Sequence, residues 1–342
     1  MGEVSIIGID LAKNSFQVHG AGSDGSVAFR RKLTRAKVLP YLAAQPDCLV
    51  AMEACAGAHH WGRKIAELGH EVKLIPPIYV KPFVKRHKND AADAEAISEA
   101  ASRPTMRFVA VKTEEQQARG MIFRTRDLLV RQRTQTINAL RGHLAEFGVI
   151  APQGPVHVHR LALAIDATEP ELPEKVCEMG RLLLERISGL DVQIKDLQKE
   201  ISANARQDEE ANRLMTIPGI GPICASAIQA FAPPMESFRR GRDFSAWLGL
   251  VPRQHTTGGK PRLGKMSKMG QRDLRRLLVV GAMSVIQWAV RRPETADPWL
   301  LRMLARKPKM VVAVALANRM ARIAWALMTN KESYRASVPA SA

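Results

Sequence analysis

The sequence predicts an α/β domain at the N-terminus, a middle region of long helices and a mostly helical C-terminal domain. Three observations predict this order. Short runs of β-branched residues alternate with helical patterns in the first segment, two long amphipathic stretches follow, and glycine and basic residues become frequent from residue 213. A single core rarely grows beyond about 250–300 residues. We therefore expect the 342 residues to divide at 1–106, 107–212 and 213–342.

The first segment is expected to hold five strands and two helices. The strands are predicted at residues 4–10, 13–19, 27–33, 49–53 and 70–75, and the helices at 61–68 and 90–101. Two of the apolar strands end in an acid, at Asp10 and at Glu53. Strands mixed with helices in this way are typical of an α/β domain.

The middle segment is expected to be helical. Long amphipathic helices are predicted at 114–147 and 174–205, with irregular, proline-containing chain at 154–173. In the second helix the apolar residues are spaced alternately four and three apart, as in a coiled-coil seam: Leu183, Ile187, Leu190, Ile194, Leu197 and Ile201. A helix packed within the same chain and a dimer zipper both fit this pattern, and we expect the partner helix to come from a second protomer.

Composition points to a polyanionic partner. The chain has 51 Lys and Arg against 33 Asp and Glu, a net charge of +18, and neutralising phosphates releases their counterions. We expect no apolar run of about 20 residues and no leader at Met1, which argues against a membrane; a basic solvated surface is the remaining alternative. Four cysteines without close pairs argue against structural zinc, and an aromatic content of 5% argues against a binder built from base-stacking platforms.

Four carboxylates form the first candidate site. Asp10 and Glu53 end two strands, while Asp90 and Asp93 lie three residues apart and share a helix face. Such a cluster repels itself unless a cation neutralises it, and oxygen ligands suit Mg²⁺ or Mn²⁺. Two ions about 3.5–4 Å apart hold the attacking and leaving oxygens in phosphoryl transfer. We therefore expect metal-dependent chemistry on phosphodiesters; the alternative is four unrelated surface acids.

Residues 217–228 (IPGIGPICASAI) resemble a helix-hairpin-helix. Gly219 and Gly221 allow a tight turn between two helical stretches. Amides there, with the following helix N-terminus, would hold a phosphate without reading sequence. The alternative is an ordinary glycine-rich turn between helices.

A basic loop is expected at residues 255–268, before a basic helix. The hydroxyls of Thr256 and Thr257 precede two glycines, among cations that suit phosphate binding or hydroxyl attack on a phosphodiester. The predicted nucleic-acid-binding residues here are Arg253, Lys260, Arg262, Lys265, Lys268, Arg272, Arg275 and Arg276. A second basic run, with Lys85, Arg86 and Lys88, precedes Asp90 and would form a nucleic-acid rim of the acidic site. Simple phosphate binding and an exposed basic surface are the respective alternatives.

Five blocks carry a family resemblance: IGIDLAK, MEACAGAHHW, KNDAADAEAI, MTIPGIGPICA and LGLVPRQHTTGGKPRLGKMSKMGQRDLRRLLV. In this order, over nearly the whole chain, they resemble the DEDD transposases of the IS110 insertion-sequence family and, within it, the IS1111 group. The resemblance implies an N-terminal RNase H-like (RuvC-like) domain whose four acids match Asp10, Glu53, Asp90 and Asp93.

The resemblance also implies a function. Such proteins cut and rejoin double-stranded DNA at element ends and target, and a C-terminal serine joins covalently to DNA. Their active site is assembled across protomers of a tetramer, and a non-coding RNA from the element selects the DNA by base pairing. We therefore expect a homo-oligomer, from dimer to tetramer, that acts in the bacterial cytoplasm at the nucleoid and not at a membrane.

One departure concerns the nucleophile. Where the family has serine just before the glycine pair, an ungapped alignment places Thr256, and a shift of one residue places Thr257. The extra methyl of threonine crowds attack and restricts χ1, so either Thr256 attacks or the enzyme is slow or inactive. Ser267 is a more distant fallback. Two other functions therefore stay open: a Holliday-junction-type nuclease without a covalent intermediate, and an inactive nucleic-acid-binding copy.

Overall fold

The computed structural model describes residues 4–84, 90–167 and 172–335, without the side chains of residues 90 and 91. The chain divides into two compact units, residues 1–117 and 118–342. The C-terminal segment of the sequence analysis and residues 118–212 of the middle segment fall in the second unit, whereas residues 107–117 fall in the first. Each unit has its own hydrophobic core, and each is described below by itself.

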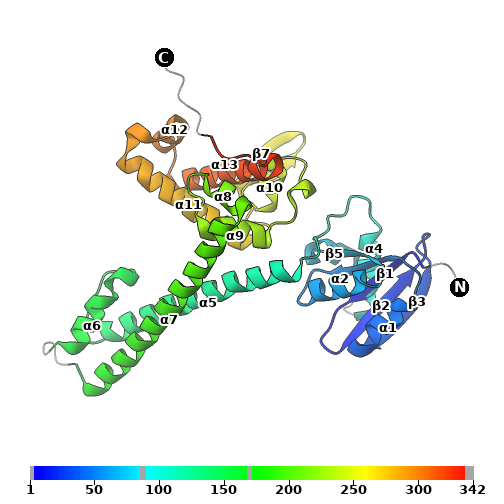
Figure 1. The fold of residues 1–342 in the computed structure, drawn as a ribbon, viewed down its shortest axis with the longest axis horizontal. Helices are drawn as coiled ribbons and strands as arrows, with labels where there is room; N and C mark the ends of the chain where they lie inside the picture. The colour runs from blue at the N-terminus through cyan, green and yellow to red at the C-terminus, as the bar shows by residue number, and fades with distance from the viewer. Residues whose placement is uncertain (1–3, 85–89, 168–171, 336–342) are drawn as a thin grey trace, which may run out of the picture. The chain divides into compact units, whose positions relative to one another are not determined.

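The first unit is built on a five-stranded sheet (Figure 1). Its order is β3-β2-β1-β4-β5, in which β1 pairs antiparallel with β2 and parallel with β4. All five expected strands are confirmed: β1 (Ile6–Asp10), β2 (Ser15–Ala21), β3 (Val27–Thr34), β4 (Leu49–Glu53) and β5 (Glu71–Ile75).

Helices cover both faces of this sheet. One face packs on α1 (Val38–Ala43) and α2 (Ala58–Ala66), where Ile7 and Ile9 of β1 meet Ile65 in one core cluster. The other face packs on α4 (Asp90–Ala101), whose Ile97 joins a second cluster with Ala51 of β4. A short helix, α3 (Pro77–Val80), follows β5. Because side chains alternate along a strand, each central strand serves both clusters.

A glycine brings α4 onto the sheet. A Cβ added to Gly8 of β1 would lie 2.3 Å from the carbonyl oxygen of Ala94 and 2.7 Å from the amide nitrogen of Ser98. The backbone of α4 therefore rests directly on β1, which only glycine allows at this position.

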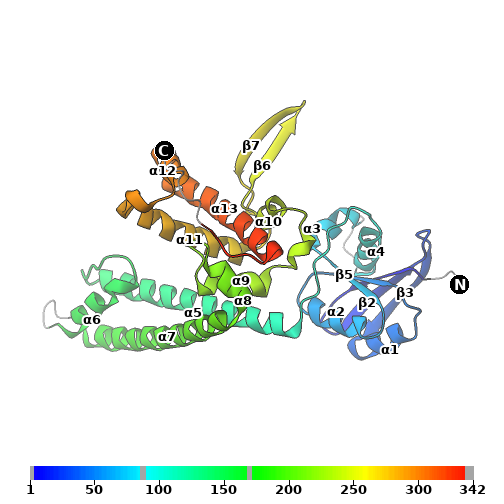
Figure 2. The ribbon, with the colours of Figure 1, turned by 45° about the horizontal axis from the view of Figure 1, so that its top comes forward.

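The second unit contains two long helices that run side by side (Figures 1 and 2). They are α5 (Glu114–Ala145) and α7 (Glu174–Gln207), with α6 (Val158–Asp166) packed at one end in the stretch expected to be irregular. Arg133 of α5 bonds Asp191 of α7 at 2.5 Å. The coiled-coil residues Ile187, Leu190, Ile194 and Ile201 are buried within this one chain. The expectation of a partner helix from a second protomer is thus not supported, because α5 lies along the seam.

The rest of this unit is a helical domain with a large core. Its helices are α8 (Glu209–Met215), α9 (Pro222–Phe231), α10 (Gly241–Trp247), α11 (Arg272–Arg291), α12 (Pro298–Arg306) and α13 (Lys309–Asn330). By length and composition α13 alone among the described helices could cross a membrane, a run that the sequence analysis overlooked. This is weak evidence, since residues such as Val312, Leu316 and Met320 are buried in the core of the unit.

The expected basic loop is a β-hairpin. Strands β6 (Pro252–Thr257) and β7 (Lys260–Met266) pair antiparallel and project from the helical domain (Figure 2). Gly258 and Gly259 make the turn with φ of +58° and +73°. Positive φ at both turn residues matches the right-handed twist of a hairpin, which explains why strands form here and not a loop.

Candidate functional site

Three of the four predicted acids lie on one face of the N-terminal sheet. In β1 and β4 the residues Ile9 and Met52 are register partners and pack toward α1 and α2. Asp10 and Glu53 come next in each strand, so alternation places both on the α4 side. Asp93 lies in the first turn of α4, which contacts β1 at Gly8. We call Asp10, Glu53 and Asp93 the acid edge.

The charges of the acid edge affect one another. Burial raises the pKa of Glu53 above its ordinary value, and the negative charge of Asp93 raises it further. Burial also raises the pKa of the Cys55 thiol, with added contributions from the charges of Glu53 and Asp10. Like charges near a partly buried carboxyl disfavour its ionised form. The acid edge therefore favours binding of a cation that would offset this repulsion.

The structure describes the side chains of three of the four predicted acids. Asp90 is the first residue of α4, but its side chain lies outside the described part, as do Lys85, Arg86 and Lys88. Among the side chains that are described, no three of Asp, Glu, His or Cys lie close enough together to hold a metal ion. The acid edge thus has the donor chemistry for a divalent ion, without a closed ligand set.

Neighbouring polar residues have structural partners. The Glu95 carboxylate of α4 pairs with Arg30 of β3 at 2.7 Å, and Glu99 pairs with Arg103 at the same distance. The Nδ1 of His59 accepts a hydrogen bond from the backbone amide of Lys112 at 3.2 Å. These contacts fit the simpler interpretation that these residues support the fold around the acid edge.

The two candidate nucleophiles lie on opposite faces of the hairpin. Thr256 is the register partner of Pro261, and its hydroxyl accepts a bond from the Gln254 side chain at 3.1 Å. Thr257 pairs with Lys260. Because residues two apart share a face, Thr257 also shares its face with the neighbouring pair of His255 and Arg262. Every residue of both strands is exposed, apart from half-buried Met266.

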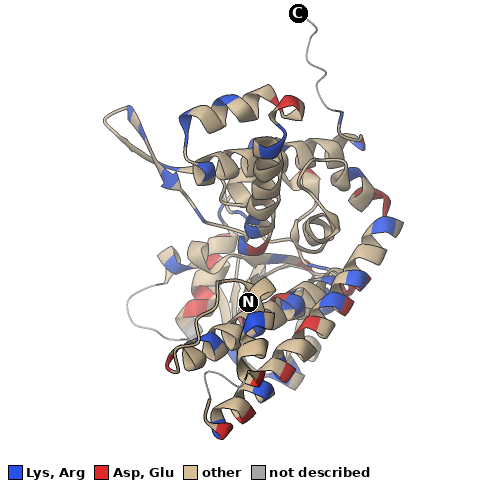
Figure 3. Cartoon of the chain, turned by 90° about the vertical axis from the view of Figure 1, so that its left-hand side faces the viewer, with Lys and Arg blue, Asp and Glu red and all other residues tan. Residues whose placement is uncertain are grey.

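The base of the hairpin is held by backbone contacts. A Cβ on Gly249 would lie 1.9 Å from the Met269 carbonyl oxygen, so this segment accepts only glycine there. Arg253 donates to the Ser267 carbonyl at 3.4 Å, which places Ser267 at the base, away from the turn. Lys268 has a φ of +56° and donates its amide to Gly249. The hairpin carries basic residues, Lys265 among them, and no acidic residue (Figure 3).

The glycine-rich turn between α8 and α9 has two different glycines. Gly219 has a φ of +89°, and a Cβ there would lie 2.8 Å from the carbonyl oxygen of Gly281 in α11. Its backbone is therefore packed on α11. Gly221 is exposed with open space around it and precedes Pro222, the first residue of α9. Of the two glycines, Gly221 is therefore the one exposed to a phosphate.

Arginines of α5 and α11 share a cleft of about 180 Å³. Arg276 pairs with Asp127 of α5, while exposed Arg272 lines the same cleft. Burial lowers the pKa of the Arg126 guanidinium, and the charge of Arg276 lowers it further. Crowding of cations in this way favours an anionic ligand. Arg275 has another role, because its guanidinium donates to the Leu248 carbonyl at 2.8 Å.

The sequence analysis missed the α5 contribution to this cleft. Three arginines of α5 line it beside those of α11: Arg124, Arg126 and Arg131. The abundance of arginine in this helix was visible, but the packing of α5 on α11 was not. Only a prediction of which helix faces meet would have found this site.

Comparisons with known proteins agree with this architecture. Residues 7–148 match a DEDD transposase family, and residues 211–297 match the family described as transposase IS116/IS110/IS902. The DEDD domain implies an RNase H-like fold, with which the mixed sheet of the first unit is consistent. DEDD transposase domains typically use divalent metal ions.

Relatives that align with this chain over nearly their whole length are also named as transposases. A probable family 20 transposase of Pseudomonas aeruginosa is 50% identical, covering 97% of this chain and 99% of that protein. The transposase of insertion sequence IS1328 of Yersinia enterocolitica is 44% identical over 96% of this chain and 98% of its own. The transposase of insertion sequence IS1111A of Coxiella burnetii is 38% identical over 98% of this chain and 92% of its own length. This chain therefore belongs to the IS110 family of DEDD transposases, enzymes that recombine DNA.

Proposed function

We propose that the acid edge is a divalent-metal site at which this transposase cuts DNA. Asp10, Glu53, Asp90 and Asp93 would be the ligands, with Mg²⁺ as the expected ion and Mn²⁺ as a substitute. The observation that carries the proposal is the meeting of Asp10 and Glu53 at adjacent strand ends beside Asp93. Such an ion, when bound, supplies a Lewis acid that stabilises charge on the phosphodiester.

The residues of the chain set the geometry of this step. Parallel pairing of β1 with β4 fixes the separation of Asp10 and Glu53, and contact at Gly8 fixes α4 and Asp93. Ligands held by sheet and helix keep their geometry better than ligands on loops. A divalent cation bound at the acid edge would offset the burial and the Asp93 charge that raise the pKa of Glu53, and would favour its ionised carboxylate.

We further propose that a threonine hydroxyl of the hairpin joins DNA covalently. The threonine oxygen would bond to the DNA phosphorus, a P–O bond of the DNA would break, and a strand with a free hydroxyl would leave, protonated by solvent. The resulting protein–DNA phosphodiester retains the bond energy, so attack by a DNA hydroxyl rejoins the strands and releases threonine without a nucleotide cofactor. The family resemblance favours Thr256, whereas the cations Lys260 and Arg262 share the face of Thr257. Gly258 and Gly259 support close approach of DNA to this turn, because a Cβ added to either would have open space within 4 Å.

Binding of double-stranded DNA follows from transposase membership, and its surface is a proposal. The exposed side of the Gly221 turn, the arginine cleft and the basic hairpin together support phosphate contact. From the family resemblance we propose a guide RNA, a dimeric to tetrameric assembly and action at the nucleoid in the cytoplasm. From the length, composition and patterning of the chain we propose three functional regions, at 1–106, 107–212 and 213–342. The helix-hairpin-helix role is proposed from the residue pattern at 217–228, and the coiled-coil role from the heptad spacing of α7.

Replacing Asp10 with Asn tests the metal site. The variant keeps the shape of the side chain and removes one ligand charge, so DNA cleavage in Mg²⁺ should fall by on the order of 10³-fold. Calorimetric titration with Mn²⁺ should show weaker binding. Asp24→Asn, in an exposed turn of the same unit, is the matched control and should cut as wild type does. Unchanged cleavage by the Asp10 variant at ordinary Mg²⁺ would refute the assignment.

A further inference from the structure

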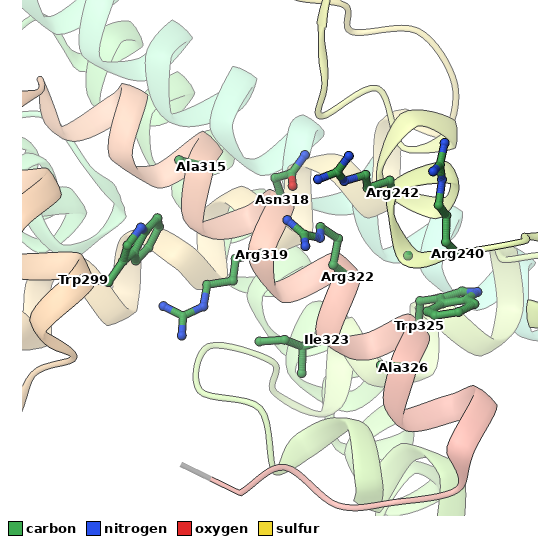
Figure 4. Close-up of a pocket in the computed structure, with 11 residues that line it drawn as sticks. Arg240, Arg242, Trp299, Ala315, Asn318, Arg319, Arg322, Ile323, Trp325 and Ala326 are labelled. Carbon is green, nitrogen blue, oxygen red and sulfur yellow. The ribbon is translucent and has the colours of Figure 1, made fainter. Parts of the chain in front are cut away.

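A second, larger cleft lies on the helical domain and shares no lining residue with the hairpin, the Gly221 turn or the arginine cleft of α5 and α11. It has a volume of about 830 Å³ and is formed by α10, α12 and α13 (Figure 4). Four arginines and two tryptophans line it: Arg240, Arg242, Arg319, Arg322, Trp299 and Trp325. No Asp or Glu is among the lining residues in the described part of the chain.

Close backbone packing builds this cleft. A Cβ on Gly241 would lie 3.1 Å from the carbonyl oxygen of Arg322, so the start of α10 rests on α13. This contact places Arg242 beside Arg322, while Arg240 lines the cleft farther from Arg322 (Figure 4). The buried Ser245 hydroxyl bonds the Asn318 carbonyl at 3.4 Å and further ties the two helices. The start of α10 and helix α13 therefore form a rigid framework that carries these arginines.

The four cations differ in how they are held. Arg319 pairs with Asp297 at 2.7 Å, and its guanidinium lies 5.0 Å from the ring centre of Trp299. Arg240 lies 3.5 Å from Asp243. Arg242 and Arg322 are exposed, and within the described residues neither has an ion pair. Two positive charges thus remain uncompensated at the mouth of the cleft.

The tryptophans supply ring surface beside these charges. Both are half-buried, and the indole nitrogen of Trp325 donates to the Met235 carbonyl at 3.3 Å, which fixes its ring. The chain has only five tryptophans, and two of them line this cleft. The low aromatic content of the whole chain therefore does not describe this site.

We propose that this cleft binds a single-stranded segment of nucleic acid. Arg242 and Arg322 would hold backbone phosphates, and an unpaired base would stack on the ring surface or on the guanidinium of Arg319. A duplex offers phosphates but keeps its bases stacked on one another, so it cannot use the tryptophans. The binding site goes beyond the proposed DNA cutting and does not depend on a metal at the acid edge.

Equilibrium binding tests this proposal without strand chemistry. The probes are a uridine oligonucleotide, a thymidine oligonucleotide and a DNA duplex of equal length, measured by fluorescence anisotropy against salt in the Asp10→Asn background. Arg242→Ala with Arg322→Ala should shallow the single-strand salt slope by about 0.7 for each phosphate that is no longer bound. The control is Arg186→Ala with Lys195→Ala, which removes equal charge from exposed positions of α7.

The tryptophans report where the strand lies. Binding of either oligonucleotide should quench tryptophan fluorescence in the wild-type chain. Trp299→Phe with Trp325→Phe keeps rings that can stack, so single-strand binding should persist while most of the quench disappears. Removing one ring altogether with Trp299→Ala should weaken single-strand binding by roughly ten-fold and leave duplex binding unchanged.

The outcomes separate the alternatives. A shallower slope for single strands in the cleft variant and not in the α7 control supports the proposal, and the stronger of the two single-strand probes identifies RNA or DNA as the ligand. Equal losses of binding affinity for duplex and single strand in the cleft variants would overturn the single-strand assignment. A slope and quench unchanged in the cleft variants would overturn the site itself, whatever the activity of the acid edge.

Discussion

The acid edge and the hairpin hold their proposed reactive groups in opposite ways. Asp10 and Glu53 follow strand residues, Ile9 and Met52, that are fully buried in the core of the first unit. Thr256 and Thr257 lie at the tip of a two-stranded ribbon on which nearly every residue is exposed. The acids are fixed by the fold, whereas the hydroxyls are fixed only at the base of the hairpin.

This difference indicates how the two halves of the chemistry are prepared. A packed sheet fixes the positions of the carboxylates before any ligand binds, and it holds them close together despite their electrostatic repulsion. An isolated two-stranded hairpin is marginally stable by itself. The hairpin is therefore expected to gain its final geometry from nucleic acid or another protein surface, and the threonines become reactive only there.

The largest effect is expected at the hairpin tip. Thr256→Val keeps the shape of the side chain and removes the oxygen, so strand joining should fall by roughly 10⁴-fold or more. Thr256→Ser should preserve or raise it, because only a crowding methyl is removed. Thr257→Val is the matched control and should still join strands. The free energy of unfolding of each variant should stay within about 0.5 kcal/mol of the wild-type value, since both positions are exposed.

Mapping the protein–DNA adduct by mass spectrometry decides between the two hydroxyls. An adduct on Thr257, with loss of joining in Thr257→Val, would transfer the role to the face that carries Lys260 and Arg262. An adduct on Ser267 would refute both threonines. Active recombination without any adduct would refute the covalent mechanism and favour a hydrolytic nuclease.

An intermediate effect is expected where α4 meets the sheet. Gly8→Ala forces a Cβ into the backbone of Ala94 and Ser98, so the free energy of unfolding should fall by about 1–3 kcal/mol. Cleavage should fall too, because Asp93 moves with α4. At Gly189 in α7 an added Cβ would have no neighbour within 4 Å. Gly189→Ala should therefore raise the free energy of unfolding by about 0.5–1 kcal/mol. Equal denaturation midpoints for the two variants would contradict the close contact at Gly8.

The smallest effect is expected from the charge of Glu53 without metal. A carboxyl whose pKa is raised on folding holds its proton more tightly in the folded state. The stability from this proton is fully present below the unfolded pKa and disappears as the pH rises through the folded pKa. In a chelator, Glu53→Gln should melt above wild type at neutral pH and equal it in acid. A variant that melts below wild type at neutral pH would disprove that burial and the charge of Asp93 disfavour the ionised form of Glu53.

Regular elements were predictable where local patterning and packing agree. The strand at 49–53 and the helix at 90–101 have the predicted bounds, because buried apolar residues and an uninterrupted helical run leave little choice. Helix α6 was overlooked because prolines flank it, although Leu161 and Ile165 are spaced four apart and buried. The hairpin was taken for a glycine-rich loop whose glycine pair allows close backbone approach, whereas both glycines form a two-residue turn between strands.

The sites were predictable only in part. Strand-end acids and a helical Asp pair can be recognised in a sequence, since each lies at an element boundary. The arginine cleft and the larger cleft of α10, α12 and α13 depend on which helix faces meet. The pairing of Gly241 with the backbone of Arg322 has no local signal, so neither cleft could be derived from the chain alone.

The contact between Gly219 and Gly281 has a consequence for how the family can vary. A Cβ on Gly281 would lie 2.0 Å from the Gly219 carbonyl oxygen, and one on Gly219 would lie 2.8 Å from that of Gly281. Two touching side chains can exchange volume, so that a larger one is compensated by a smaller one. Here each prospective side chain meets main chain, which no substitution can shrink. Both positions are therefore constrained separately, and a change at either cannot be rescued by a second change at the other.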